Sequence, residues 1–356
     1  MKLVFGILSF ALISCAQTSK VESISSKKFE IEKVYQGKSV LWGFDFLSPN
    51  ELIISHKKKK LVYYNLETKK SKELTTPKYK KGGQGGLLDV LVHKEYVYIT
   101  YSKELKEDNV VTALARGKWS NGELIELKDI YISNAGGDAG RHFGSRLLIK
   151  DEALYMTVGE RGERDKAQSL KFDNGSVLRL TLKGEPHPEN NVSKDRPAIY
   201  SYGHRNPQGI TLIGDKIIEA EFGPRGGDEI NLIQKGKNYG WPVITYGSEY
   251  YGPSIGSEKK AGMEQPLHYW VPSISPSGMA YYNLDKIKIF KDQLFLANLS
   301  SAHIRMLSID KNLKVTKEVE LFKDMSERFR MLRASSDGFL YFSTDSGALY
   351  RVKKQL

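Results

Sequence analysis

His142 is the residue of this sequence best suited to move a proton. It lies in a glycine-rich segment, residues 136–146, beside Arg141 and close to Arg146. Neighbouring cations lower the pKa of a histidine and keep it neutral at working pH, so this imidazole could act as a general base. A lone histidine is more often a structural hydrogen-bonding residue, and Glu160 in the next insert could be only an ion-pair partner. Both interpretations stay open at this level.

Arg205 and Asn206 form a pair of hydrogen-bond donors within residues 200–209. A guanidinium and an amide can both donate to one anionic or carbonyl oxygen, as in sites that stabilise an oxyanion developing during a reaction. Gln84 is the single amide of another polar segment, residues 81–89, whose glycines allow close approach to the backbone. Taken alone that segment is weak evidence, because glycine clusters usually form tight turns.

A fourth segment, residues 221–229, is acidic and rich in glycine, and is followed by Asn-Tyr-Gly-Trp-Pro at 238–242. Calcium takes carboxylate and backbone carbonyl ligands, which such a loop can present, although the spacing is not that of an EF-hand. His204 and His268 could join His142 in a transition-metal site, but nothing in their spacing requires one.

The elements that must position these segments are short β-strands. A turn followed by a strand, with a second strand after it, occurs six times beyond Phe29. The pairs are residues 50–55 and 61–64, 94–100 and 110–114, 151–158 and 177–182, 214–220 and 229–233, 291–297 and 304–307, and 337–343 and 349–352. The sequence lacks amphipathic helical stretches of about 12 residues or more, which excludes parallel folds with helical crossovers. A spacing of roughly 40–80 residues fits a four-stranded antiparallel blade. We therefore predict an all-β protein, a six-bladed β-propeller.

Residues 29–34 are expected to complete the last blade and close the ring, which leaves no exposed sheet edge. Propellers bind their ligands through loops around the central channel, and loops carry most functional residues. The longest inserts are residues 159–174, 184–197 and 238–276, and we expect ligand contacts in them.

Composition narrows the functional classes. The chain has 356 residues, of which 40% are hydrophobic and 27% charged, and this balance excludes a disordered or polytopic membrane protein. The formal net charge of +12 favours anionic surfaces or ligands. The lysine runs 57–60 and 78–81 are expected to be solvated loop faces that also favour an anionic membrane surface. Nucleic acid is not expected, because stacking aromatics are not interleaved with the basic residues.

The N-terminus has the form of an export signal. One lysine and an apolar stretch make up residues 1–14, and the only cysteine, Cys15, follows directly in Leu-Ile-Ser-Cys-Ala, which resembles the bacterial lipobox. A single cysteine also excludes a disulfide framework. We expect a lipoprotein signal peptide at 1–14, lipidation of Cys15, an unstructured tether at 15–28 and the propeller at 29–356. The protein would then be periplasmic and anchored to the outer membrane by lipid alone. An ordinary signal peptide followed by an incidental thiol is the alternative.

Taken together, these segments resemble the soluble PQQ-dependent aldose sugar dehydrogenases of the glucose/sorbosone dehydrogenase family. The resemblance runs from about Phe29 to the C-terminus. It is carried by the strings at residues 83–89, 142–147, 202–209, 223–229 and 238–242, which occur in the family's order.

The resemblance implies a quinoprotein that oxidises aldoses at the anomeric carbon to lactones and passes electrons to a periplasmic acceptor. His142 would be the base, and Arg205 and Asn206 would stabilise charge on the quinone oxygen. Calcium would act as a Lewis acid on the same oxygen. The implied PQQ contacts are Gln84, Glu160, Arg205, Asn206, Arg328 and Arg330, and Glu160 also matches an acidic position near the base. The implied calcium ligands are the carbonyls of Gly223 and Pro224 and, at a second, structural site, Glu229 and Tyr239.

Two positions depart from the family pattern. Phe222 stands where the family usually has histidine or glutamine, and Ser300 stands where a cofactor-contacting lysine is usual. These departures favour an alternative, a non-catalytic propeller lipoprotein that binds a glycan or protein after losing its cofactor. A third hypothesis is hydrolysis of sugar lactones on a metal-bearing propeller.

Overall fold

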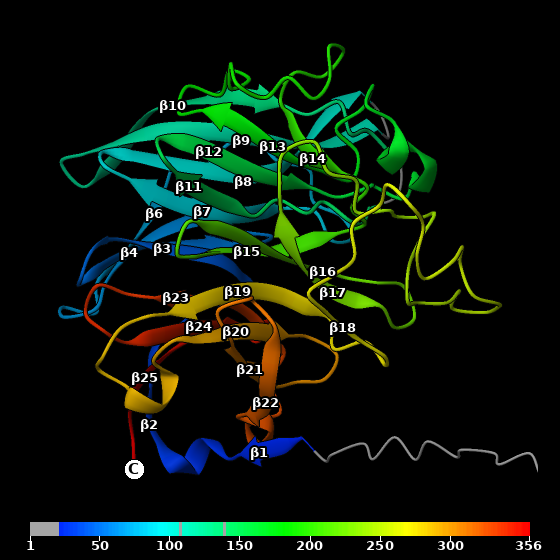
Figure 1. Cartoon of the computed structure of the whole chain (residues 1–356). Coiled ribbons are helices and arrows are strands. Elements are labelled where there is room, and N and C mark those ends of the chain that lie inside the picture. The colour runs from blue at the N-terminus through cyan, green and yellow to red at the C-terminus, as the bar shows by residue number, and fades with distance from the viewer. Residues whose placement is uncertain (1–20, 107–108, 138–139) are drawn as a thin grey trace, which may run out of the picture.

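The protein consists of six β-sheets in the computed structural model, which describes residues 21–106, 109–137 and 140–356. Figure 1 shows these sheets following one another in chain order. Each contains four antiparallel strands, and the first strand of each lies beside the first strands of neighbouring sheets. The predicted six-bladed β-propeller is therefore confirmed.

The first three blades, from the central strand outward, have the following bounds. Blade 1 is β3 (Leu41–Ser48), β4 (Glu51–His56), β5 (Leu61–Asn65) and β6 (Ser71–Leu74); blade 2 is β7 (Leu87–His93), β8 (Tyr96–Lys106), β9 (Asn109–Ser120) and β10 (Glu123–Ile132); blade 3 is β11 (Leu147–Lys150), β12 (Ala153–Val158), β13 (Ser176–Thr181) and β14 (Ile199–Tyr202). The predicted strand pairs are the second and third strands of each.

The remaining blades follow the same order. Blade 4 is β15 (Pro207–Ile213), β16 (Lys216–Glu221), β17 (Asp228–Ile233) and β18 (His268–Trp270); blade 5 is β19 (Pro276–Tyr282), β20 (Gln293–Asn298), β21 (Ile304–Ile309) and β22 (Val315–Leu321); blade 6 is β23 (Phe329–Ala334), β24 (Leu340–Thr344), β25 (Ala348–Gln355) and β2 (Phe29–Gln36). Short 3-10 helices are η1 (Ser26–Lys28), η2 (Arg164–Gln168), η3 (Lys288–Phe290) and η4 (Lys323–Met325). Strand β2 pairs antiparallel with β25, as predicted, so the two ends of the propeller close one blade.

The segment before Phe29 is not unstructured throughout. Strand β1 (Glu22–Ile24) pairs in parallel with β22, which gives blade 5 a fifth strand, and η1 follows it. Asp324 accepts hydrogen bonds from Ser25 and Ser26 and fixes this turn. The expectation of an unstructured tether is thus wrong for residues 22–28, because the free edge of β22 offers backbone groups to pair with. The predicted signal peptide and Cys15 lie outside the described residues.

Large apolar side chains fill the spaces between blades. Between blades 5 and 6, for example, Phe29, Phe290 and Phe322 pack ring against ring. The described residues include no helix that is both long and apolar enough to span a membrane.

One buried guanidinium, that of Arg146, closes the central channel. It lies 3.9 Å from the Trp42 ring centroid, and it is bonded to one residue from the central strand of each other blade. These partners are Trp42 O at 3.2 Å, Asp89 Oδ1 at 3.1 Å, Gln208 O at 2.8 Å, Ser277 O and Arg330 O at 3.0 Å. A side chain from blade 3 thus joins all six blades directly beneath the loops that follow.

Candidate functional site

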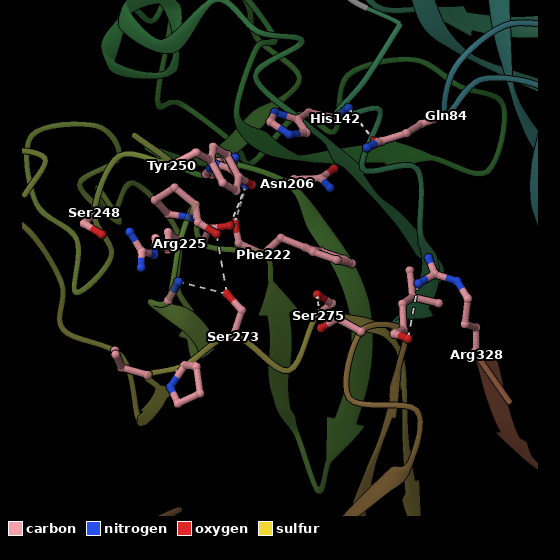
Figure 2. A pocket seen from close by; sticks show the side chains of 18 residues that line it. Gln84, His142, Asn206, Phe222, Arg225, Ser248, Tyr250, Ser273, Ser275 and Arg328 are labelled. Carbon is pink, nitrogen blue, oxygen red and sulfur yellow. Dashed lines mark hydrogen bonds between the residues drawn. The ribbon is translucent and has the colours of Figure 1, made fainter. Parts of the chain in front are cut away.

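A cavity of about 880 Å³ opens at one end of the propeller (Figure 2). In each blade, the loop between the second and third strands and the loop leading to the next blade lie at this end, because consecutive strands are antiparallel. The predicted residues that line the cavity are Gln84, His142, Arg205, Asn206, Gly223, Pro224 and Arg328. Positions that are 244 residues apart in the sequence therefore meet around one space.

His142 and Glu160 form a buried pair at the edge of this cavity. Nδ1 of His142 is hydrogen bonded to Oε1 of Glu160. Burial lowers the pKa of His142, and the charges of Arg205 and Arg141 lower it further, although Glu160 opposes them. Burial raises the pKa of Glu160, but its contacts with His142, together with the charge of Arg205 and the backbone N–H of Gly162, hold the pKa below the ordinary value. A neutral imidazole with its proton on Nδ1 keeps the Nε2 lone pair for a substrate proton.

Gln84 holds the main chain at His142. Its Oε1 accepts a hydrogen bond of 2.8 Å from the backbone N–H of His142, and that bond leaves the amide Nε2 free to donate to a ligand. Glu160 does not line the large cavity, since its carboxylate is turned to His142. Oε1 of Glu160 thus contacts His142, and no described residue bonds to its buried Oε2.

Arg205 and Asn206 lie side by side at the start of β15. Nη1 of Arg205 donates to the carbonyls of Phe222 and Gly223 at 3.1 and 2.7 Å, and its buried Nε has no partner among the described residues. Burial lowers the pKa of this guanidinium. Oδ1 of Asn206 accepts from the N–H of Gly144 at 3.2 Å, so its NH₂ group faces the site as a donor. These donors fit an anionic or quinone oxygen in the cavity.

The loop after β16 presents the predicted calcium carbonyls. Asp228 is buried and accepts from the N–H groups of Gly223, Ile274 and Ser275 at 2.8, 2.6 and 2.7 Å. This network fixes the loop, whose Gly223 and Pro224 both line the cavity. Carbonyl oxygens are hard donors that fit calcium, but two of them make an incomplete shell, so a bound cofactor would have to supply further ligands.

The arginines of blade 6 differ from one another. Arg330 is buried, and its Nε and Nη2 bond to Asp345 at 2.8 and 2.9 Å. Arg328 shares that carboxylate at 3.0 Å, but half of its side chain is exposed and it lines the cavity. Arg328 can therefore reach a cofactor carboxylate, whereas Arg330 lies behind it as its support. Sequence analysis missed Asp345, since no string marks it.

The predicted structural calcium residues lie in different surroundings. Glu229 joins Glu219 and Glu221 in a buried cluster around Asn231, whose Nδ2 lies 3.4, 3.3 and 3.2 Å from their oxygens. Burial, reinforced by the charge of Glu221, raises the pKa of Glu219 and Glu229 well above the ordinary value. Tyr239 instead donates its hydroxyl to a backbone carbonyl, so only its main chain is available to a metal.

His204 extends the carboxylate cluster. Its Nδ1 lies 3.0 Å from Glu221 Oε1, and ligand atoms of His204, Glu219 and Glu221 all lie within 4.8 Å of one another. The sequence contained a usable signal for this cluster. Glu219 and Glu221 alternate on β16, and their partners on β17 are Asn231 and Glu229. His268 lies elsewhere, paired with Glu318, so the three-histidine metal site is wrong.

The long inserts contribute unequally. Residues 159–174 supply Glu160, which bonds to His142. Residues 238–276 supply Ser248 and Tyr250 to the wall of the large cavity. Residues 184–197 instead pack along the outer side of blade 3, where Asn190 bonds to the carbonyl of Arg179, and they line neither cavity at the site. The expected ligand contacts in that insert are therefore wrong. Phe222 and Ser300 both line the cavity, and Ser300 bonds to Ser275 at 2.7 Å.

Fold and site together define a class of protein, a six-bladed propeller with a buried histidine–glutamate pair and amide and guanidinium donors at the mouth of its channel. The family model for glucose/sorbosone dehydrogenase matches residues 38–351. The chain belongs to this family and is an oxidoreductase.

Individual relatives agree with that assignment. Aldose sugar dehydrogenase YliI of Escherichia coli is 37% identical over 288 residues, which are 76% of this chain and 77% of the relative. Quinoprotein glucose dehydrogenase B of Acinetobacter calcoaceticus is 32% identical over 46% of this chain and 41% of its own. The crystal structure of the soluble aldose sugar dehydrogenase from E. coli, in its apo-form, superposes with a TM-score of 0.87 at 33% identity, covering 91% of this chain and 99% of that one.

Proposed function

We propose that this protein oxidises aldose sugars at the anomeric carbon to lactones, with PQQ as oxidant and calcium as its Lewis acid. The observation that carries the proposal is the buried His142–Glu160 pair at the edge of a cavity lined by Arg205 and Asn206. Family membership and the quinoprotein relative support the substrate class and the cofactor.

The oxidation removes a proton from the anomeric hydroxyl and a hydride from the anomeric carbon as the C=O bond of the lactone forms. PQQ, when bound, supplies the quinone that accepts the hydride and is reduced by two electrons. Nε2 of His142 takes the proton, and Glu160 stabilises the imidazolium through Nδ1. Arg205 and Asn206 donate to the oxygen on which negative charge grows.

The cavity fits the absent cofactor by its chemistry. PQQ is a flat anion with several carboxylates, and the wall offers Arg328, the unpartnered Nε of Arg205 and the free amide of Gln84. Gly223 and Pro224 would hold calcium through their carbonyl oxygens, where it would polarise the quinone. A second, structural cation would lie at Glu229 and the main chain of Tyr239, beside the other carboxylates of the cluster.

Reconstitution tests the function. The protein is titrated with PQQ in the presence of calcium, the quinone absorbance is followed, and dye reduction is measured with a panel of aldoses. We expect saturable binding and sugar-dependent reduction that His142→Ala abolishes. His187→Ala is the matched control, because His187 lies in the insert that does not reach the cavity. Failure to bind PQQ with calcium in excess would leave the non-catalytic, glycan- or protein-binding propeller as the better explanation.

The location is part of the proposal. A lipid on Cys15 would hold the protein at the periplasmic face of the outer membrane, and the electrons would pass to a periplasmic acceptor. The lipobox resemblance of residues 12–16 supports this anchor. Incorporation of labelled fatty acid that is lost in Cys15→Ser tests it, and equal labelling of the variant would contradict it.

A further inference from the structure

A second, smaller cavity of about 240 Å³ adjoins the base. This cavity and the large one share a wall, because both are lined by Gln84, His142, Arg205 and Tyr250. The remaining lining residues are Arg141, Glu160, Gly162 and Arg164. We call this space the side cavity. It begins where the anomeric end of a bound sugar must lie, because both spaces contain His142.

The charges around the side cavity do not cancel. Among the described residues Glu160 is the only carboxylate in its lining, and its Oε1 is bonded to Nδ1 of His142. Arg164 is neutralised by Glu249, with a hydrogen bond of 3.0 Å between Nη2 and Oε2. Arg205 donates to backbone carbonyls, which carry no net charge. The positive charge of Arg205 is therefore not balanced by a paired carboxylate.

Arg141 adds a second uncompensated charge. Within the described part of the chain its guanidinium has no ion pair and no hydrogen-bond partner, although it lines the side cavity next to the base. The Arg141 side chain is exposed, directly precedes His142 in the sequence and lines the same cavity as the imidazole. An unpaired guanidinium beside a cavity is a binding group for a planar or tetrahedral anion, which it can hold through two parallel hydrogen bonds.

We propose that the side cavity binds an anionic substituent of the sugar, and that the preferred substrates are aldoses carrying a carboxylate or a phosphate ester. This inference rests on the proposed function and names the substrate class of the same site. With the anomeric hydroxyl at His142, the charged end of the sugar lies at Arg141. The anionic group is not altered by the oxidation, so the proton and hydride transfers remain those described above.

Two further features favour this substrate class. The amide Nε2 of Gln84 has no described protein partner and lies between the two cavities, where it can donate to a ring hydroxyl. The net charge of +12 raises the local concentration of anions at the protein surface and speeds their association. A solvated arginine without a ligand is the opposing explanation for Arg141.

Steady-state kinetics of the holoenzyme with glucuronate, glucose 6-phosphate and glucose provide the test. We expect kcat/KM for at least one anionic sugar to exceed that for glucose by roughly tenfold, through a lower KM. The anionic sugar with the higher kcat/KM shows whether the side cavity favours a carboxylate or a phosphate ester. In Arg141→Gln, the ratio of kcat/KM for that anion to kcat/KM for glucose should fall by about the same factor, and Arg141→Lys should restore part of it.

Lys59→Gln is the matched control, since it removes one exposed positive charge from a loop that lines neither cavity. In Lys59→Gln, the ratio of kcat/KM for the anionic sugar to kcat/KM for glucose should stay at the wild-type value. A preference for glucose over both anions, or an equal fall in Arg141→Gln and Lys59→Gln, would overturn the inference.

Calorimetry separates this inference from the proposed function. Glucuronate and glucose 6-phosphate should bind the cofactor-free protein more tightly than glucose, and Arg141→Gln should remove the difference. If no sugar is oxidised after reconstitution but this difference is seen, the dehydrogenase function fails and the anion subsite stands. If sugars are oxidised without any such difference, the subsite fails alone.

Discussion

Glu160→Gln removes the carboxylate that orients and stabilises His142 while keeping the shape of the side chain. The bond between Glu160 and Nδ1 of His142 becomes charge-assisted when the imidazole takes a proton. Hydrogen bonds to charged groups contribute about 1.5–3 kcal/mol, and each 1.36 kcal/mol of barrier is a factor of ten. We therefore expect kcat to fall by roughly 10- to 150-fold.

The pH profile gives a second, independent readout. His142 has a pKa below its ordinary value of 6.5, so it is neutral at pH 7, and kcat/KM should rise with pH as the imidazole loses its proton. Glu160 raises that pKa, because it stabilises the imidazolium. In Glu160→Gln, the acid limb of the profile should therefore move to lower pH.

The assay is dye-coupled sugar oxidation by the reconstituted protein, with PQQ affinity measured separately by absorbance. Glu163→Gln is the control, because Glu163 is paired with Lys166 and lines neither cavity. A kcat for Glu160→Gln equal to that of the control, with an unmoved acid limb, would refute the assignment of His142 as a base supported by Glu160. A loss of PQQ binding would instead assign Glu160 to the cofactor.

Three other changes test different parts of the molecule. Arg146→Met should lower the free energy of unfolding by about 3–5 kcal/mol in urea denaturation, since it leaves the carboxylate of Asp89 buried without its partner; a loss below about 1 kcal/mol would contradict its role in joining the blades. Gly223→Ala should weaken PQQ and calcium binding in absorbance titrations, because the new Cβ would lie 2.2 Å from the carbonyl oxygen of Gly226. Unchanged affinity would show that this loop does not bind the cofactor or calcium. Glu219→Gln should raise the Tm of the metal-free protein at pH 8. The folded-state pKa of Glu219 is raised, so unfolding releases its proton and stability falls as pH rises from about 4.5 towards the folded pKa. The rise in Tm caused by Glu219→Gln should therefore be smaller at pH 5. An equal rise in Tm at both pH values would show that Glu219 is ionised in the folded protein.

The blade pattern was readable in the sequence because it is local. An antiparallel strand pair needs only alternating side chains and a turn, and both lie within about 20 residues of sequence. His142, Arg205 and Asn206 stood out for the same reason, since each lies in a short polar string between strands. Strand β1 was missed, because its three residues are stable only against the free edge of β22, almost 300 residues away.

Side-chain partnerships between different loops of one blade could not be read from the sequence. The resemblance placed an acidic residue near the base at Glu160, but nothing local indicates that Asp345 pairs with both blade 6 arginines. The same limit applies to the inserts, whose length alone predicted ligand contacts. The insert at 184–197 instead folds along the outside of blade 3.

By itself, the sequence determined the strand order, the number of blades and the residue types available for proton transfer, because strand pairing between neighbours and side-chain chemistry are local properties. Only the tertiary structure decided which side chains face one another around the channel. Closing the ring brings loops from distant parts of the chain to one end. Burial there then lowers the pKa of His142, while the exposed Arg141 lines the side cavity without a partner among the described residues.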